Sequence, residues 1–353
     1  MPGSQTRVIF SGVGRVARDV TRLLRARPSD RIVAAYSRDP DLMGKDLGVV
    51  AGGDPLSVVI TNDRSEALAV PADILVIATT SFLKDVATDI KAGIESGLNV
   101  LCTAEEMAFP WLSDEDLAKE IDVLAKKKGV TVLGGGVNPG FLSDALVLTA
   151  ASAAWNVDHI MVRRAVDLSH FSATILRRLG IGFSVDDFEA GTLAGEIFGH
   201  IGFPESMHLV ARALGLRVEK VTQSFTPYLA QVDLTLEHAE VRKGLTAGFR
   251  QHATAHVEGK PWFEAEFVGH VDPDSIGATL RDEIDIQGYS PVHLSITPGL
   301  QAQQGVAALI ANSLGRVTAG PPGLVTVADL PPARPSPTLL STLAPDWVVP
   351  WKV

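Results

Sequence analysis

Residues 7–17 read RVIFSGVGRVA, an apolar β-strand pattern that runs through Gly12-x-Gly14-x-x-Ala17 into the start of a helical pattern. Glycines in a turn between a strand and a helix let backbone N–H groups approach a dinucleotide pyrophosphate at the helix N-terminus. The turn alone is a weak signal, but its place directly after a strand is the context that the motif requires. The predicted cofactor-binding residues of this turn are Gly12, Gly14, Arg15 and Val16.

The first 140 residues alternate between strand and helix patterns, which is typical of a parallel sheet with right-handed crossovers. Strands are expected at Arg7–Phe10, Arg31–Tyr36, Leu56–Thr61, Ile74–Ala78, Val100–Thr103 and Val130–Leu133. Helices are expected between them at Val16–Ala26, Phe82–Ser96 and Asp114–Lys128. Asn138 then offers an N-cap and Pro139 a first helical position, so a helix is expected at Phe141–Ala154. We predict an α/β chain whose residues 1–140 form an NAD(P)-binding Rossmann domain.

Beyond residue 140 the pattern changes to long alternating strands, expected at His159–Val166, Gln231–Leu236, Phe249–Val257 and Trp262–Val271. Strands with few helices predict an α+β domain with an open mixed sheet at residues 141–297, for substrate binding and dimerisation. One face of such a sheet needs cover, which a partner subunit in a homodimer would supply. A helix expected at Pro298–Leu314 returns to the first domain, so that about residues 298–330 complete it. Residues 331–353 are rich in proline and predict an extended C-terminal tail.

The composition excludes several classes of protein. The chain has 353 residues, of which 46% are hydrophobic and 20% charged, so it can bury two cores. Its formal net charge of −10 argues against nucleic acid and anionic membranes as partners. No uncharged apolar run has the length of a membrane span, and no signal-peptide pattern precedes the first strand. The single cysteine, Cys102, indicates a small core residue without a disulfide, and a cytoplasmic localisation is expected.

The end of the second strand indicates which cofactor is bound. An acidic residue there holds the ribose hydroxyls of NAD, but this strand is followed by Ser37 and Arg38. A hydroxyl and a guanidinium suit a 2′-phosphate better, so NADP is the preferred cofactor and NAD the alternative. If the strand ran further, Asp39 could instead bind the ribose hydroxyls of NAD. The alternative for Arg38 is that it is a solvated charge in a loop. Further cofactor contacts are expected from hydroxyl residues at the ends of later strands, Thr79, Thr80 and Thr103. The alternative role for the hydroxyl residues at 79–81 is a helix cap, because Ser81 precedes a helical pattern, and both roles can hold at once.

Glu105 and Glu106 follow the strand that ends at Thr103, where a carboxylate can lie beside the reactive end of a bound nicotinamide. If Thr103 is the N-cap of a following helix, Glu106 falls at the N3 position of a Thr-x-x-Glu capping box and has a structural role. Glu105 has no such role, so it is the predicted catalytic residue, with a pKa raised by burial. Alternatively, both are solvated carboxylates favoured by the helix dipole.

His200 and one of two neighbouring arginines are further candidates. His200 lies among glycines ahead of a Pro-initiated helix, where a histidine is often a satisfied loop residue. Arg163 and Arg164 lie on one expected strand, so one of them points inward or toward a partner. An inward arginine suits a substrate anion or, equally, a buried ion pair. The histidines show no metal-ligand spacing alongside cysteine, so no metal is predicted.

Several motifs together resemble the 2,4-diaminopentanoate dehydrogenase family, which includes the native amine dehydrogenases and has a dihydrodipicolinate reductase-like fold. The motifs are GVGRVA at 12–17, GKDLG at 44–48, ATTSFLKDV at 78–86, TAEEMAFPW at 103–111, GGGVNPGF at 134–141, GHIGFPES at 199–206 and PPGLVTVADLP at 321–331. The resemblance implies NAD(P)-dependent oxidative deamination of a primary amine, reversible as reductive amination of a small ketone or aldehyde with ammonia. It places the catalytic glutamate in the TAEE segment and implies substrate contacts from Asn138, Phe141, Arg164 and His200.

The residues leave two other classes of protein open. One is an NADP-dependent reductase or dehydrogenase that acts on C=N or C–OH bonds without ammonia. The other is a non-catalytic NADP-sensing protein. The His-His-x-x-Lys and Ser-Gly-Thr signatures of dihydrodipicolinate reductase are absent, so a role in lysine biosynthesis is not expected.

Overall fold

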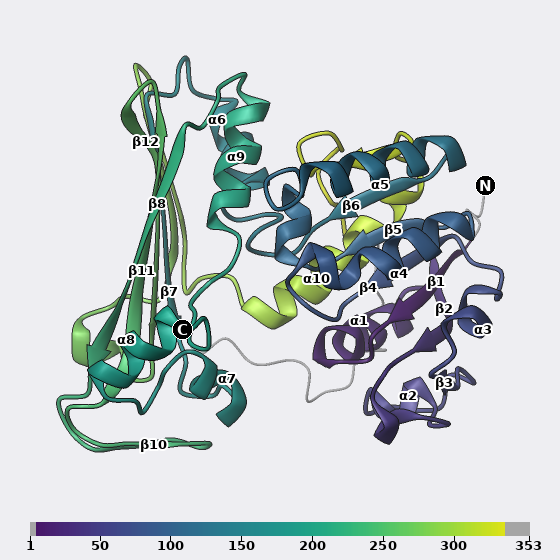
Figure 1. Cartoon of the computed structure of the whole chain (residues 1–353), viewed down its shortest axis with the longest axis horizontal. Coiled ribbons are helices and arrows are strands. Elements are labelled where there is room, and N and C mark those ends of the chain that lie inside the picture. Colours follow the sequence, from purple (N-terminus) through teal and green to yellow (C-terminus); the bar gives the residue numbers. More distant parts are fainter. Residues whose placement is uncertain (1–4, 336–353) are drawn as a thin grey trace. The chain divides into compact units, whose positions relative to one another are not determined.

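The computed structural model describes residues 5–335, which fall into two compact units. The first unit ends at Leu142 and resumes at Gln301, and the second is Ser143–Leu300 (Figure 1). Each unit has a sheet and a hydrophobic core of its own. The tail predicted at residues 331–353 lies outside the described residues from position 336 onward.

A seven-stranded parallel sheet in the order β15-β6-β5-β4-β1-β2-β3 forms the centre of the first unit. Its strands are β1 (Thr6–Ser11), β2 (Asp30–Tyr36), β3 (Ile60–Thr61), β4 (Ile74–Ile77), β5 (Asn99–Cys102), β6 (Thr131–Gly134) and β15 (Gly323–Val325). All four residues of β4 are buried, because helices cover both faces of a parallel sheet and its central strands are therefore apolar throughout. The Rossmann-like sheet predicted from the alternating pattern is confirmed.

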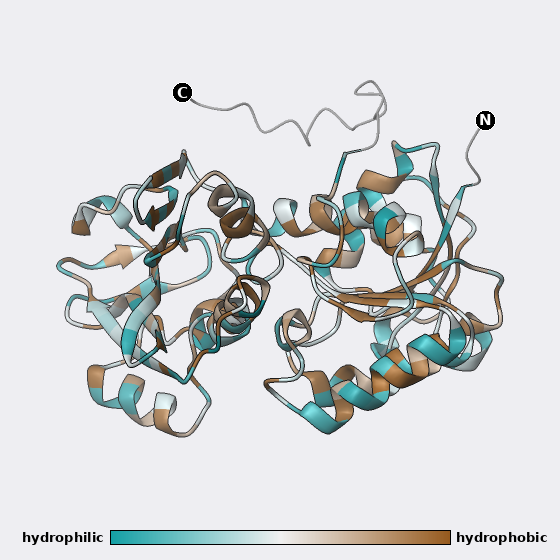
Figure 2. Cartoon of the chain, turned by 90° about the horizontal axis from the view of Figure 1, so that it is seen from above, coloured by the Kyte–Doolittle hydropathy of each residue, from teal (hydrophilic) through white to brown (hydrophobic). Residues whose placement is uncertain are grey.

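Helices pack on both faces of this sheet. They are α1 (Arg15–Arg25), α2 (Leu47–Val50), α3 (Arg64–Leu68), α4 (Leu83–Glu95), α5 (Glu115–Lys128) and α10 (Ala302–Thr318), with 3₁₀ turns η1 (Pro40–Leu42) and η2 (Glu105–Ala108). On one face, α4 and α5 bury Val86, Ile90 and Ile121 in a core with the strands, while α1 and α10 pack together on the other. Figure 2 shows hydrophobic residues along the strands and a polar outer side on the helices. The helix expected at Pro298–Leu314 is present as α10, which begins at Ala302 and ends at Thr318.

Two local predictions for this part of the chain are wrong. The helix expected at Phe141–Ala154 is only α6 (Ala145–Ala151), with Asp144 as its N-cap. The reason is a tight turn at Gly140, which has φ of +116° and where an added Cβ would lie 2.2 Å from the backbone nitrogen of Gly136. The strand expected at Leu56–Thr61 is reduced to the two residues of β3.

The second unit contains a six-stranded mixed sheet in the order β14-β13-β7-β12-β11-β8. Its strands are β7 (His159–Asp167), β8 (Lys220–Leu229), β11 (Thr246–Val257), β12 (Lys260–His270), β13 (Asp282–Gln287) and β14 (Val292–Ile296). Only the β7–β12 pair is parallel, so the predicted open mixed sheet is confirmed. The strand expected at Gln231–Leu236 is reduced to the two residues of β9 (Leu234–Thr235), which pairs with β10 (Glu240–Val241) in a separate hairpin and not in this sheet.

The two faces of the mixed sheet differ in polarity. The helices of the second unit are α6, α7 (Ala173–Arg178), α8 (Val185–Leu193) and α9 (Phe203–Ala213). Of these, α6 and α9 pack on one face of the sheet. That face carries buried residues such as Phe249 and Phe263. The other face carries ion pairs, among them His159 with Glu264 at 2.8 Å. The alternating in-and-out pattern of the strands accounts for this division.

Neither a membrane-spanning helix nor a metal-binding cluster occurs within residues 5–335. No helix there has both the length and the apolar composition that crossing a membrane requires. No three His, Cys, Asp or Glu side chains there are grouped so that they could hold a metal ion.

Candidate active site

The turn after β1 has the shape that a dinucleotide phosphate needs. Gly12 has φ of +84°, and a Cβ added to it would lie 2.5 Å from Cγ2 of Thr79 and 2.9 Å from the carbonyl oxygen of Ala78. Gly14 is the N-cap of α1, with no side-chain cap and nothing within 4 Å of an added Cβ. A side chain at Gly14 would fill this open space beside the free N–H groups of the helix, which is where anions bind.

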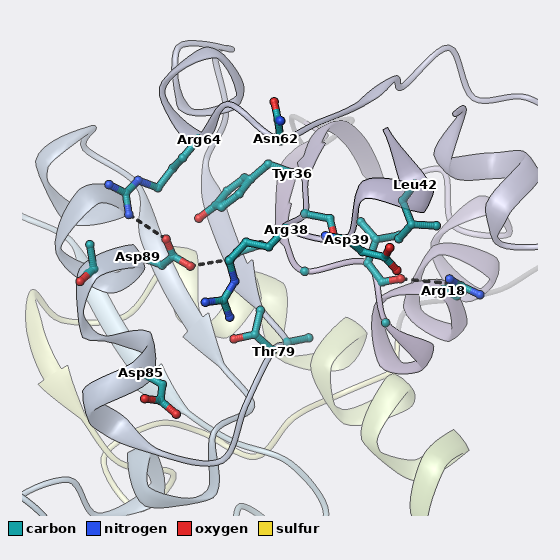
Figure 3. A pocket seen from close by; sticks show the side chains of 17 residues that line it. Arg18, Tyr36, Arg38, Asp39, Leu42, Asn62, Arg64, Thr79, Asp85 and Asp89 are labelled. Carbon is teal, nitrogen blue, oxygen red and sulfur yellow. Dashed lines mark hydrogen bonds and ion pairs between the residues drawn. The ribbon is translucent and has the colours of Figure 1, made fainter. Parts of the chain in front are cut away.

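A cavity of about 590 Å³, within the range of small-molecule sites, opens from this turn (Figure 3). Five of the predicted cofactor residues line it together: Gly12, Gly14, Ser37, Arg38 and Thr79. The other four do not line it: Arg15, Val16, Thr80 and Thr103. Thr80 instead donates a hydrogen bond to Asp85 at 3.3 Å, as expected of a residue near the start of α4. The structure therefore gathers the turn and the end of β2 at one site.

The end of β2 presents a cation to this cavity. The strand ends at Tyr36, as predicted, and Arg38 is exposed, with no ion pair to a carboxylate in the described part of the chain. Asp39 is occupied locally, because its Oδ1 accepts a hydrogen bond of 3.0 Å from the backbone of Asp41 and caps η1. Arg38 and Asp39 both line the cavity, and Arg38 is the cation at this position.

A polar network in the same cavity was not predicted from the sequence. Asp89 accepts a hydrogen bond of 2.9 Å from the hydroxyl of Ser11 and pairs with Arg64 at 3.0 Å (Figure 3). These contacts join the end of β1 to α3 and α4. The one available signal was that Arg64 follows β3, whose carboxyl end lies at the ligand edge of the sheet.

The two glutamates after β5 have separate environments. The predicted Thr103–Glu106 capping box is wrong, because the N-cap of η2 is Ala104 and no side chain caps this turn. Glu106 Oε2 instead accepts a hydrogen bond of 2.6 Å from the backbone of Leu83, the first residue of α4. The N-cap of α4 is Phe82, which has no oxygen to offer, so Glu106 supplies the missing acceptor from another segment.

Glu105 begins η2 and is half-buried. Close packing fixes the position of this turn: a Cβ added to Gly134 would lie 2.0 Å from the carbonyl oxygen of Met107. The nearby Cys102 is buried, and burial, with a contribution from the charge of Glu105, raises its pKa to about 12. The thiol is therefore neutral and no nucleophile. Glu106 contacts the start of α4, and Glu105 is the second carboxylate at this strand end.

Asn138 and Phe141 follow β6, which is the neighbour of β5 in the parallel sheet. Both are half-buried. Asn138 Oδ1 is buried and accepts no hydrogen bond from residues 5–335. A buried acceptor without a donor in the protein is costly, so water or a ligand that donates a hydrogen bond would satisfy it.

In the second unit, Arg164 is the inward-pointing arginine of β7. It is 6% exposed, and its Nη1 donates to both carboxylate oxygens of Asp282, at 3.0 and 3.1 Å. Its Nη2 donates to the carbonyl oxygen of Leu300 at 2.6 Å. Arg163 lies on the opposite face and pairs with Asp285. Of the two interpretations of an inward arginine, the structure contains the buried ion pair.

His200 has a fixed backbone and a buried, neutral ring. The side chain of Gln251 accepts a bond of 2.6 Å from the His200 backbone nitrogen and donates one of 2.9 Å to its carbonyl oxygen. The ring packs against Phe203 and Phe267, and its Nε2 is buried with no hydrogen-bond partner in the described residues. Burial, and then the charge of Arg164, lowers the pKa of His200 to about 3. The imidazole is therefore uncharged at neutral pH.

The C-terminal domain of 2,4-diaminopentanoate dehydrogenase matches this chain over residues 141–340. The chain belongs to the 2,4-diaminopentanoate dehydrogenase family. The 2,4-diaminopentanoate dehydrogenase of Acetoanaerobium sticklandii is 31% identical over 338 residues, which cover 94% of each chain. The resemblance found in the sequence motifs is thereby confirmed, and the chain is an oxidoreductase of this family.

Amine dehydrogenases are also similar to this member of the family. The amine dehydrogenase of Streptomyces virginiae is 24% identical, over 91% of this chain and 94% of its own. The solved structure of the amine dehydrogenase from Mycobacterium smegmatis superposes with a TM-score of 0.83 at 27% identity, over 95% of this chain and 99% of its own. Both units thus belong to the fold that this family shares.

Glu106→Ala is expected to lower the free energy of unfolding by about 0.5–2 kcal/mol, as the loss of a helix cap does. Gln at this position keeps an oxygen that can accept from Leu83, so Glu106→Gln should cost less. Thermal or denaturant unfolding measures both, with Glu95→Ala as the control, because Glu95 is exposed at the other end of α4. Equal losses for Glu106→Ala and Glu95→Ala would show that the Leu83 contact contributes nothing.

Proposed function

We propose that this protein is an NAD(P)-dependent amine dehydrogenase. In the reductive direction, a small ketone or aldehyde, ammonium, NADPH and one proton give the primary ammonium product, NADP⁺ and water. The observation that carries the proposal is the placement of Glu105. It begins η2 directly beyond β5, in the same parallel sheet whose β1 opens into the nucleotide turn. Ligands of such sheets bind beyond the carboxyl ends of the strands.

The cofactor residues are those of the cavity at the nucleotide turn. Gly12 and Gly14 would hold the pyrophosphate with the N-terminus of α1, and Ser37 and Arg38 would bind the 2′-phosphate of NADP. When bound, the nicotinamide supplies the hydride. NADP is the proposed preference because the cavity contains Arg38, which has no ion pair among the described residues, and because one oxygen of Asp39 is used in capping η1. Contacts from Arg15, Val16, Thr80 and Thr103 stay predictions.

Glu105 is the proposed proton acceptor and electrostatic partner of the substrate. Its carboxylate would take a proton from ammonium and stabilise the cationic iminium carbon, where positive charge develops. Asn138 Oδ1, buried without a donor, would accept from the N–H groups of ammonia or of the amine product. Phe141, Arg164 and His200 are the other proposed substrate-binding residues, and the raised pKa of Glu105 stays a prediction.

Oxidation of NADPH in the presence of a panel of small ketones, with and without ammonium, tests the proposal. Turnover that requires ammonium supports an amine dehydrogenase. Turnover that proceeds without ammonium indicates a reductase of C=O or C=N bonds instead. Cofactor binding without turnover of any carbonyl indicates an NADP-sensing protein.

The second unit is proposed to form a two-fold dimer. The uncovered sheet face is more polar than the sequence suggested, with pairs such as Arg163–Asp285 and His293–Asp285. The side chains of these pairs are partly exposed, so a second copy could meet them with charges of the opposite sign. Light scattering at micromolar concentration is expected to give twice the mass of one chain. A monomeric mass would count against the dimer.

A further inference from the structure

We propose that Asp282 determines the substrate class: by neutralising Arg164, it makes the site select carbonyl compounds and amines that carry no carboxylate. The inference rests on the proposed function, in which Arg164 and His200 contact the substrate. Asp282 acts through Arg164, so it is a positioning and specificity residue and not a catalytic one.

Arg164 and Asp282 form a buried ion pair in which each charge has its counter-charge inside the protein. Both residues are almost fully buried, at 6% and 2% exposure. Asp282 receives both bonds from Nη1 of Arg164, and its Oδ2 also accepts from the backbone nitrogen of Leu300 at 2.7 Å. The positive charge of the guanidinium therefore has a full counter-charge within hydrogen-bond distance. A substrate carboxylate would have to compete with Asp282 for it.

Among the described residues, no Lys or Arg lines the cavity at His200, and the guanidinium of Arg178 lies behind its wall, stacked on Phe198 at 4.0 Å. The imidazole itself is uncharged, as its low pKa shows. The cavity of about 480 Å³ that His200 lines is walled by residues such as Ile197, Phe198 and Phe225, with one acidic residue, Glu205, and no Lys or Arg. A buried carboxylate without a cation is strongly disfavoured, whereas an alkyl group is well accommodated in such surroundings.

This arrangement contrasts with what the name of one relative implies. 2,4-Diaminopentanoate carries a carboxylate, and the relative from Acetoanaerobium sticklandii is named for that compound. With 31% identity between the two chains, the residues around the substrate are free to differ. The Arg164–Asp282 pair is the feature of this chain from which we infer a preference for substrates without a carboxylate.

Pentan-2-one and 4-oxopentanoate form a matched pair of probes, because they share a five-carbon skeleton and a methyl ketone and differ in the terminal carboxylate. We expect kcat/KM for pentan-2-one, with NADPH and ammonium, to exceed that for 4-oxopentanoate by about 100-fold or more, mainly through KM. This comparison uses the unmodified protein and does not depend on whether a variant folds. Equal efficiencies, or a preference for 4-oxopentanoate, would overturn the inference alone. Failure to turn over either ketone would remove the proposed function as well.

Asp282→Asn tests the residue itself. Asn keeps the shape and an acceptor for Arg164 but removes the negative charge, so the guanidinium becomes available to a carboxylate. The preference for pentan-2-one should fall roughly tenfold or more, through a lower KM for 4-oxopentanoate. Asp285→Asn is the control, because it makes the same chemical change in a partly exposed pair with Arg163 on the opposite face of β13. A folded Asp282→Asn protein with an unchanged preference, or the same change in Asp285→Asn, would overturn the assignment.

Discussion

Glu105→Gln is expected to lower turnover by ~10²–10⁴-fold, the range for a general acid–base group. Glutamine keeps the size and the hydrogen-bonding atoms of the side chain but removes the negative charge. Both the ammonium that gives up a proton and the iminium that receives hydride require that charge. The loss should appear in kcat, whereas the melting temperature and the affinity for NADPH should stay close to those of the unmodified protein.

Glu106→Gln is the matched control for this experiment, because it makes the same chemical change at the adjacent position. Glu106 accepts from the backbone of Leu83, and a glutamine can accept in its place, so substantial activity should remain. An inactive Glu106→Gln beside an active Glu105→Gln would move the catalytic role by one residue. If both variants turn over normally, the carboxylate mechanism is wrong.

The architecture of the first unit could be predicted because its sequence signals are local. Strands such as Ile74–Ile77 are buried on both faces and appear as apolar runs, and α5 has its own cap at Asp114 and ends at Gly129 with φ of +72°. Each of these signals lies within the element that it specifies. The short helices α2 and α3 and the edge strand β15 were missed, because elements of three to five residues carry too few positions for a periodic pattern.

The second unit was harder to predict in detail. β8 and β14 are the edge strands of its sheet, and β8 has several exposed polar residues and contains Pro227. An edge strand has one unpaired edge that is open to solvent, and one of its faces can also be solvated. Its composition therefore resembles that of a loop. The long central strands β11 and β12, by contrast, alternate clearly and were placed within a few residues.

Within the site, the sequence did not predict which residues form contacts when they are distant from each other along the chain. A structural role for Glu106 was predicted, but its partner was sought within four residues and lies at Leu83, 23 residues away. The alternation along β7 showed that one arginine points inward, yet nothing local indicates Asp282, which is 118 residues from Arg164. Capping rules and strand periodicity describe neighbours along the chain, whereas these contacts depend on how the elements pack.

Arg38→Ala is expected to weaken NADPH binding by about 1–3 kcal/mol, the contribution of charge-assisted hydrogen bonds, and to leave NADH binding nearly unchanged. Arg38 lies in the nucleotide cavity just beyond β2 and forms no ion pair with a carboxylate among residues 5–335, so no internal contact is lost. The effect should therefore depend on the 2′-phosphate, the group that distinguishes the two cofactors.

Titration of each variant with NADPH and with NADH measures this directly. Arg31→Ala is the control, since Arg31 is an exposed arginine of the same strand that does not line the cavity. Because Arg38 is exposed, its attraction for the phosphate is screened by salt, and the preference of the unmodified protein for NADPH should narrow as ionic strength rises. Equal losses for both cofactors in Arg38→Ala would show that Arg38 contacts a part that they share. An unaltered NADPH affinity would leave Arg38 as a solvated loop charge and remove the physical basis for preferring NADP over NAD.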